Sequence, residues 1–106
     1  MKINDSVVAY YWRLRINVYA RSIARQIITQ LKHDVSHKYG PRIPIGEDSE
    51  RYLESRAVHL TQPLVDKVMC DNPQIPNVLG NKLLLIAARR AVTLIWSESN
   101  VRKKSA

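Results

Sequence analysis

The fold is decided by the stretch from Asp5 to Tyr39, which reads DSVVAYYWRLRINVYARSIARQIITQLKHDVSHKY. Apolar residues recur in it at steps of three and four, as one side of an α-helix requires. The recurring positions are Val8, Trp12, Ile16, Tyr19, Ala20, Ile23, Ile27, Leu31 and Val35. Neither Gly nor Pro interrupts the stretch, and Gly40 followed by Pro41 is a strong signal for the end of a helix. We therefore predict a single helix over 5–39.

The length of this helix has a consequence for assembly. A straight helix over 5–39 is about 52 Å long, whereas a compact domain of this size has a radius of gyration of about 13 Å and is roughly 34 Å across. The helix outgrows a lone globule unless it ends early, near Lys32, because the stretch from Asp34 to His37 has the weakest helix propensity. We expect a second copy to cover the excess length, in a homodimer or a larger homo-oligomer packed through this helix.

The rest of the chain predicts two or three further helices. Residues 40–48 hold two Gly and two Pro and are expected to form a loop. Residues 48–70 are expected to form a helix pair interrupted at Pro63, which either kinks one helix or sits in the first turn of the next. Residues 77–97 are apolar nearly all round and predict a buried helix, and 98–106 predict a basic tail. The predicted fold is an all-α bundle of three to four helices in a single domain over 1–106.

Composition limits the classes of protein to which this chain can belong. It has 106 residues, of which 45% are hydrophobic, and a single cysteine, Cys70. One cysteine excludes an internal disulfide and favours a reducing compartment. No apolar run approaches the roughly 20 residues that a membrane-spanning helix needs, and no basic start with an apolar run marks a secretory signal. We expect a cytoplasmic protein.

The net charge of +8 is distributed unevenly. Residues 1–46 hold eight basic and two acidic residues, 47–76 hold three and six, and 77–106 hold six and one. Two interpretations follow from this pattern. Either the acidic middle folds against the basic ends and compensates them, or the basic ends meet a polyanion.

A cationic face on the first helix favours a nucleic-acid partner. At 100° per residue, Arg21, Arg25 and Lys32 lie within about 40° of arc. With the basic residues near the C-terminus they can track phosphates, and the predicted nucleic-acid-binding residues are Arg21, Arg25, Lys32, Arg89, Arg90, Arg102, Lys103 and Lys104. The chain has no helix-turn-helix glycine turn, zinc finger or aromatic RNA-binding motif, so we expect contacts that do not depend on base sequence. The leading hypothesis is an accessory or regulatory factor that binds nucleic acid.

The three consecutive aromatic residues Tyr10, Tyr11 and Trp12 leave several interpretations open. Next to Arg13 and Arg15 they can stack on bases, seat a basic helix on a membrane surface, or pack in the core or between subunits. The rival hypothesis for the whole chain is a protein-interaction module, an inhibitor or assembly subunit. It would use exposed Ile, Tyr and Trp side chains and the acidic segment 47–54.

Catalysis and metal binding have weaker support. His33 and His37 are four residues apart and face the same way on a helix, but a metal site needs further ligands, and His59 has no evident place in one. Cys70 lacks a His or carboxylate that would orient it as a nucleophile. We predict no enzymatic activity, no metal and no cofactor.

Overall fold

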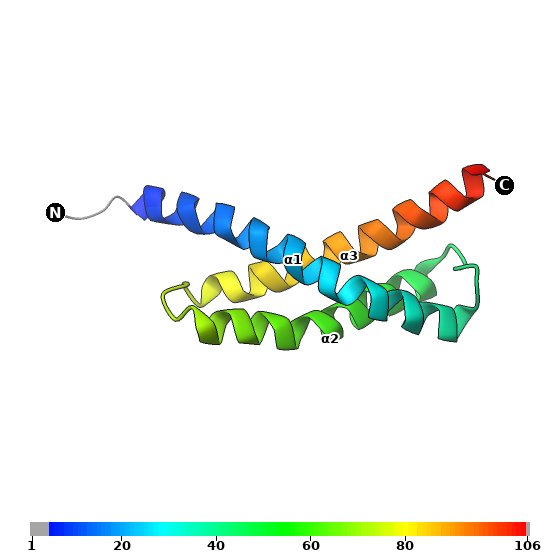
Figure 1. Cartoon of the computed structure of the whole chain (residues 1–106), viewed down its shortest axis with the longest axis horizontal. Coiled ribbons are helices and arrows are strands. Elements are labelled where there is room, and N and C mark those ends of the chain that lie inside the picture. Colours follow the sequence, from blue (N-terminus) through cyan, green and yellow to red (C-terminus); the bar gives the residue numbers. More distant parts are fainter. Residues whose placement is uncertain (1–4, 106) are drawn as a thin grey trace.

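The computed structural model describes the backbone of residues 5–105 and the side chains of residues 10–98. Its elements are three α-helices, α1 (Asp5–Tyr39), α2 (Glu47–Asp71) and α3 (Val78–Ser105), and residues 5–105 contain no strand. Each helix packs against the other two. In Figure 1, α2 returns along α1, and α3 then runs in the same direction as α1 and crosses it. The protein is therefore an all-α bundle of three mutually packed helices.

The first helix has the bounds expected from the sequence, and its end follows from local chemistry. Gly40 has φ +81°, in the left-handed region that favours glycine, and its N–H donates to the carbonyl oxygen of Ser36 at 2.8 Å. Pro41 cannot continue the helix. The loop is slightly shorter than expected, because α2 begins at Glu47, where three carboxylates lie in the first turn near the positive end of the helix dipole. The buried hydroxyl of Ser49 lies within hydrogen-bond distance of the carbonyl oxygens of Pro44 and Gly46.

Pro63 does not interrupt the second helix, so the expectation of a helix pair over 48–70 is wrong. A row of side chains spaced four residues apart is buried on both sides of the proline: Ser49, Leu53, Ala57, Thr61 and Val65. Pro63 itself is exposed on the opposite side. A proline inside a helix costs about 3 kcal/mol. Burial of the whole row of side chains in one continuous helix offsets that cost better than burial of the same residues in two short helices would.

Replacing Pro63 with Ala is therefore expected to raise the free energy of unfolding by about 1–3 kcal/mol. Alanine restores the backbone N–H that proline lacks, and the exposed position loses no packing. The midpoint of urea unfolding followed by circular dichroism measures the change. An unchanged or lowered midpoint would show that the chain needs a bend at this position.

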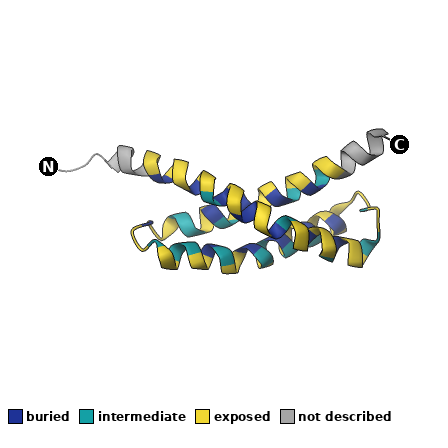
Figure 2. Cartoon of the chain, viewed as in Figure 1, coloured by how far each residue is buried: buried dark blue, intermediate teal, exposed yellow. Residues whose placement is uncertain are grey.

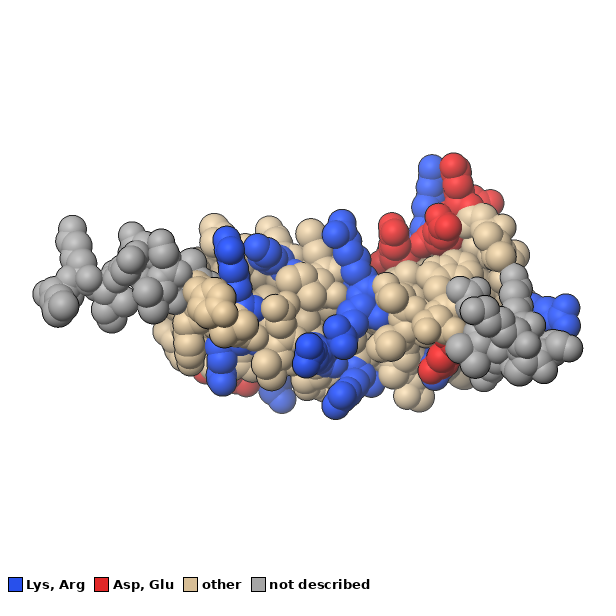
Figure 3. Space-filling view, turned by 90° about the horizontal axis from the view of Figure 1, so that it is seen from above, with Lys and Arg blue, Asp and Glu red and all other residues tan. Residues whose placement is uncertain are grey.

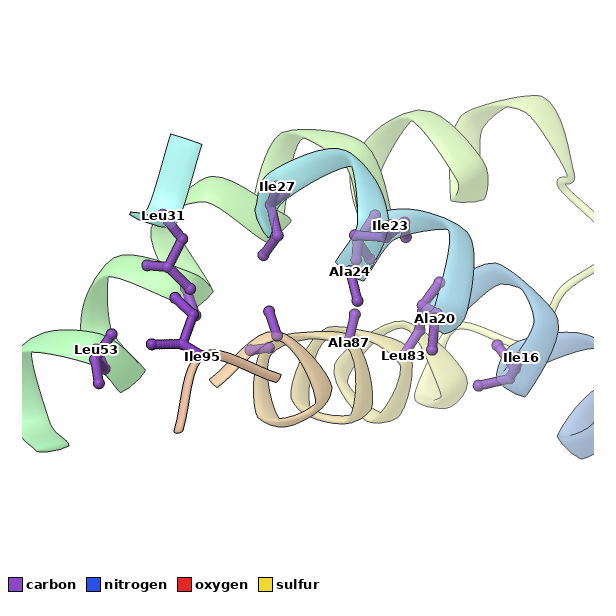
Figure 4. Close-up of a cluster of buried hydrophobic side chains, with 14 of the residues drawn as sticks. Ile16, Ala20, Ile23, Ala24, Ile27, Leu31, Leu53, Leu83, Ala87 and Ile95 are labelled. Carbon is purple, nitrogen blue, oxygen red and sulfur yellow. The ribbon is translucent and has the colours of Figure 1, made fainter. Parts of the chain in front are cut away.

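The core is a single cluster that runs between the three helices (Figure 2). α1 contributes seven of its nine predicted apolar positions as buried residues, while Tyr19 is half-buried and the side chain of Val8 lies outside the described residues. At the crossing, Figure 4 shows Ala24 of α1 directed toward Ala87 of α3. Small side chains there let the two helices approach closely. Further along, Leu31, Leu53 and Ile95 bring one side chain from each helix together.

Two expectations for α3 are corrected by the structure. α3 is not buried on most sides, because Leu85 and Leu94 are exposed alongside Arg89 and Arg90. The helix also continues to Ser105 instead of giving way to a tail near residue 98, although the side chains beyond Glu98 are outside the described part. A helix that contacts two neighbours on one side keeps its other side in solvent.

The shape is elongated. The principal extents are 60 × 25 × 22 Å and the radius of gyration is 16.2 Å, against about 13 Å for a compact chain of this length. Figure 1 shows the beginning of α1 and the end of α3 diverging at opposite ends of the molecule. The outer faces of these helices are therefore open to solvent along much of their length.

Candidate nucleic-acid interface

Three of the predicted cationic residues are exposed on α1 and α3, two helices that meet along an outer seam. The position of the seam follows from Lys32, which shares its arc of α1 with Arg21 and Arg25 and forms an ion pair with Glu98 of α3 at 2.7 Å. That arc of α1 therefore borders α3 at Lys32. On α3, Arg90 lies eight residues before Glu98, about 80° from it round the helix. We call Arg21, Arg25 and Arg90 the seam cluster.

The seam cluster is exposed and has no acidic partner. All three side chains are exposed, and none forms an ion pair within the part of the chain whose side chains are described. Seen from above, Lys and Arg side chains form a band across the middle of the molecule, and carboxylates gather toward one end (Figure 3). Three guanidinium groups, two on α1 and one on α3, are therefore free of described ion pairs and available to bind an anion.

The other predicted cations are placed differently. Arg89 is exposed but lies about 100° further round α3 than Arg90. Lys32 is engaged by Glu98, so a phosphate has to compete with that carboxylate. The side chains of Arg102, Lys103 and Lys104 lie outside the described residues, and α3 carries these positions in a helix.

The acidic middle of the sequence does not neutralise the seam cluster. The one described ion pair between the acidic segment 47–76 and the N-terminal basic segment has its charges reversed: Arg56 of α2 donates to Asp34 of α1, with Nε and Oδ2 2.7 Å apart. Arg51 contacts Glu47 at 3.9 Å within α2 itself. Among residues 10–98, no carboxylate of the acidic segment therefore forms an ion pair with the seam cluster.

The Arg56 guanidinium holds the pKa of Asp34 below its ordinary value of 3.8, mainly through their hydrogen bond. Partial burial of the carboxyl opposes this shift, and a second hydrogen bond, from Gln30 Nε2 at 2.9 Å, adds to it. The ion pair joins α1 to α2 and contributes to the fold rather than to binding.

Because Asp34 has a lower pKa in the folded chain than in the unfolded chain, its ionised form stabilises the fold above about pH 3.8, and this contribution is lost as the pH falls through the folded pKa. Asp34→Asn is therefore expected to be less stable than the wild type at neutral pH, with a difference that shrinks in acid. Urea midpoints of both proteins between about pH 7 and pH 2 measure it. A difference that stays constant over this range would show that the ion pair does not contribute.

Sequence reasoning missed Leu14 and Val18 in the apolar part of this face and left several interpretations of Tyr10 and Tyr11 open. Tyr10, Leu14 and Val18 are 64%, 51% and 61% exposed, and Tyr11 is 52% exposed. At 100° per residue these side chains lie on the arc of α1 that carries Arg21 and Arg25. The helical-wheel angles that place the cations on one arc of α1 also place these apolar residues on or next to that arc. Trp12, by contrast, is buried beneath the edge of the Tyr11 ring, with the ring centroids 5.1 Å apart, and cannot stack on a base.

A shallow depression joins the apolar and cationic parts of α1. It is lined by Val18, Arg21, Ser22, Arg25 and Gln26. Its lining combines one aliphatic side chain with two guanidinium groups, a hydroxyl and an amide. Such a lining suits a ligand that has both an anionic group and an apolar surface.

The three histidines and the single cysteine are all exposed. The His33 and His37 rings stack with their centroids 6.5 Å apart, and His59 is exposed on α2. No group of three or more His, Cys, Asp or Glu side chains suited to a metal ion occurs in the described part of the chain. Cys70 is exposed. None of the helices, over the residues described, is both long and apolar enough to cross a bilayer.

Comparison of this chain with protein-family models, with curated proteins and with solved structures finds no match.

Proposed function

We propose that this chain is a small helical accessory or regulatory protein that binds nucleic acid through its phosphates, without reading base sequence. The seam cluster supports this proposal, because Arg21 and Arg25 share one exposed arc of α1, Arg90 is exposed on the packed helix α3, and no described carboxylate pairs with them. Arg89 extends the surface around α3, and Lys32 extends it along α1 after release from Glu98. Arg102, Lys103 and Lys104 would extend it further toward the C-terminus.

Binding of this kind has a measurable signature. Each phosphate that is neutralised releases condensed counterions, so the logarithm of the affinity falls linearly with the logarithm of salt concentration, by roughly 0.7–0.9 per contact. Mobility shifts and fluorescence anisotropy with generic DNA and RNA at about 50 mM salt are expected to show binding that weakens steeply as salt is added. Absence of binding to every nucleic acid under these conditions would refute the proposal. The accompanying proposal of a cytoplasmic role rests chiefly on the single cysteine, and that of a non-enzymatic role rests on the lack of a catalytic motif in the sequence.

A second candidate is a protein-interaction module that self-associates through the first helix. It is favoured by the exposed apolar side chains of α1, since contiguous apolar surface on a small protein commonly marks an interface. Light scattering at high concentration tests it. A mass near twice the 12.2 kDa of the chain would support a homodimer, and the monomer mass would exclude it.

A further inference from the structure

We propose that the outer face of α1, from Tyr10 to Arg25, binds a single strand of nucleic acid, with unpaired bases on the exposed apolar side chains and phosphates on the two arginines. This inference rests on the proposed nucleic-acid function and names the form of nucleic acid that the site takes. We call the exposed side chains of Tyr10, Tyr11, Leu14 and Val18 the apolar stripe.

The apolar stripe and the cations form one continuous path. Tyr10, Leu14 and Val18 follow one another at steps of four, and Arg21 and Arg25 continue along the same arc of α1. The depression lined by Val18, Arg21, Ser22, Arg25 and Gln26 lies where the two parts meet. From Tyr10 to Arg25 the helix rises about 22 Å. A strand at duplex spacing would place roughly six phosphates along that length, and an extended strand fewer.

The chemistry of this path matches an unpaired strand better than a duplex. In a duplex the base faces are stacked on one another and cannot reach a protein ring, so the apolar stripe would face only sugars and phosphates. A single strand exposes both its base faces and its phosphates, and proteins that bind single strands combine cations with aromatic side chains in this way. Tyrosine rings stack on any base, which agrees with binding that ignores base sequence.

Other occupants fit this surface less well. The apolar stripe is bordered by Arg13, Arg15 and Arg21, and α1 has no carboxylate between Asp5 and Asp34. Two copies packed stripe against stripe would bring like charges together, which disfavours a close contact. Four exposed side chains also fall well short of the roughly 20–30 residues per partner in a stable protein interface. Charge complementarity therefore favours a polyanion over a second copy.

The inference is tested by anisotropy titrations of a labelled single-stranded oligonucleotide and of a duplex of equal length at the same salt concentration. The wild-type protein is expected to bind the single strand at least about tenfold more tightly. Tyr10→Ala with Tyr11→Ala is expected to weaken single-strand binding by about tenfold or more, because each stacked base contributes that much. The duplex affinity is expected to stay nearly unchanged.

Two control proteins keep the result specific. Tyr10→Phe keeps the ring and is expected to bind like the wild type. Val78→Ser removes an exposed apolar side chain on another helix, at the start of α3, and is also expected to bind normally. Helix content by circular dichroism verifies that each variant is folded, and all the changed side chains are exposed.

The outcomes separate this inference from the function on which it rests. Equal affinity for single strand and duplex, together with unchanged binding by the double tyrosine variant, would overturn the inference and leave phosphate binding in place. No binding to either form would overturn both. In that case, a dimer mass that Val18→Glu returns to the monomer would assign the apolar stripe to a second copy of the chain.

Discussion

Replacing Arg21, Arg25 and Arg90 together with glutamine is expected to weaken binding to nucleic acid by about a thousandfold at 50 mM salt. Release of condensed counterions at this salt concentration contributes roughly a factor of ten per phosphate contact, and the triple variant removes three contacts. The slope of log affinity against log salt is expected to become shallower by about 2 to 3. Because the three side chains are exposed and form no described ion pair, the fold is expected to remain intact.

A matched control separates position from net charge. Arg42, Arg51 and Lys67 are exposed cations away from the seam, so replacing these three with glutamine changes the net charge by the same amount. We expect this control to bind within a fewfold of the wild type. If it lost as much affinity as the seam variant, binding would follow overall charge, and the seam cluster would not be the site.

Replacing Leu31 with Ala is expected to lower the free energy of unfolding by about 2–5 kcal/mol. Leu31 has no exposed surface and lies near Leu53 of α2 and Ile95 of α3, so its loss leaves a cavity between the three helices. A small domain has a total stability of only about 5–15 kcal/mol, so the loss is a large fraction of it. Urea unfolding followed by circular dichroism measures the change.

The control for this prediction is Leu85→Ala on α3. Leu85 is 49% exposed, and alanine has a higher helix propensity than leucine, so a change within about 0.5 kcal/mol is expected. A loss as large as that of Leu31→Ala would mean that Leu85 is covered in solution. It would therefore point to a protein contact on the outer side of α3.

Local signals in the sequence predicted the fold where they act within one helix. The stops at Gly40 and Pro41 and the spacing of the apolar residues located α1, because both effects operate over a few residues. Pro63 was misinterpreted because its local penalty is offset by burial of a row that runs past it on α2. The extension of α3 beyond residue 97 was missed because a polar, basic stretch can continue a helix without an apolar face.

The candidate interface was predicted only in part because its decisive contacts join distant residues. Lys32 was included as a free cation, and its partner Glu98 is 66 residues away, so no local pattern reveals the pair. How close Arg90 of α3 lies to the arginines of α1 likewise depends on how the helices cross. The exposure of Tyr10 and the burial of Trp12 follow from where the neighbouring helices end, and a helical wheel alone does not contain that information.

The central claim is that the outer face of α1 and its seam with α3 contact nucleic acid, and a titration of the 15N-labelled protein with a short single strand tests it most directly. The account predicts that amide signals of residues 10–25 and of Arg90 shift on addition of the strand and return when salt is raised. Shifts confined to the acidic first turns of α2, or to residues 52–71, with the α1 and Arg90 signals unmoved, would contradict it.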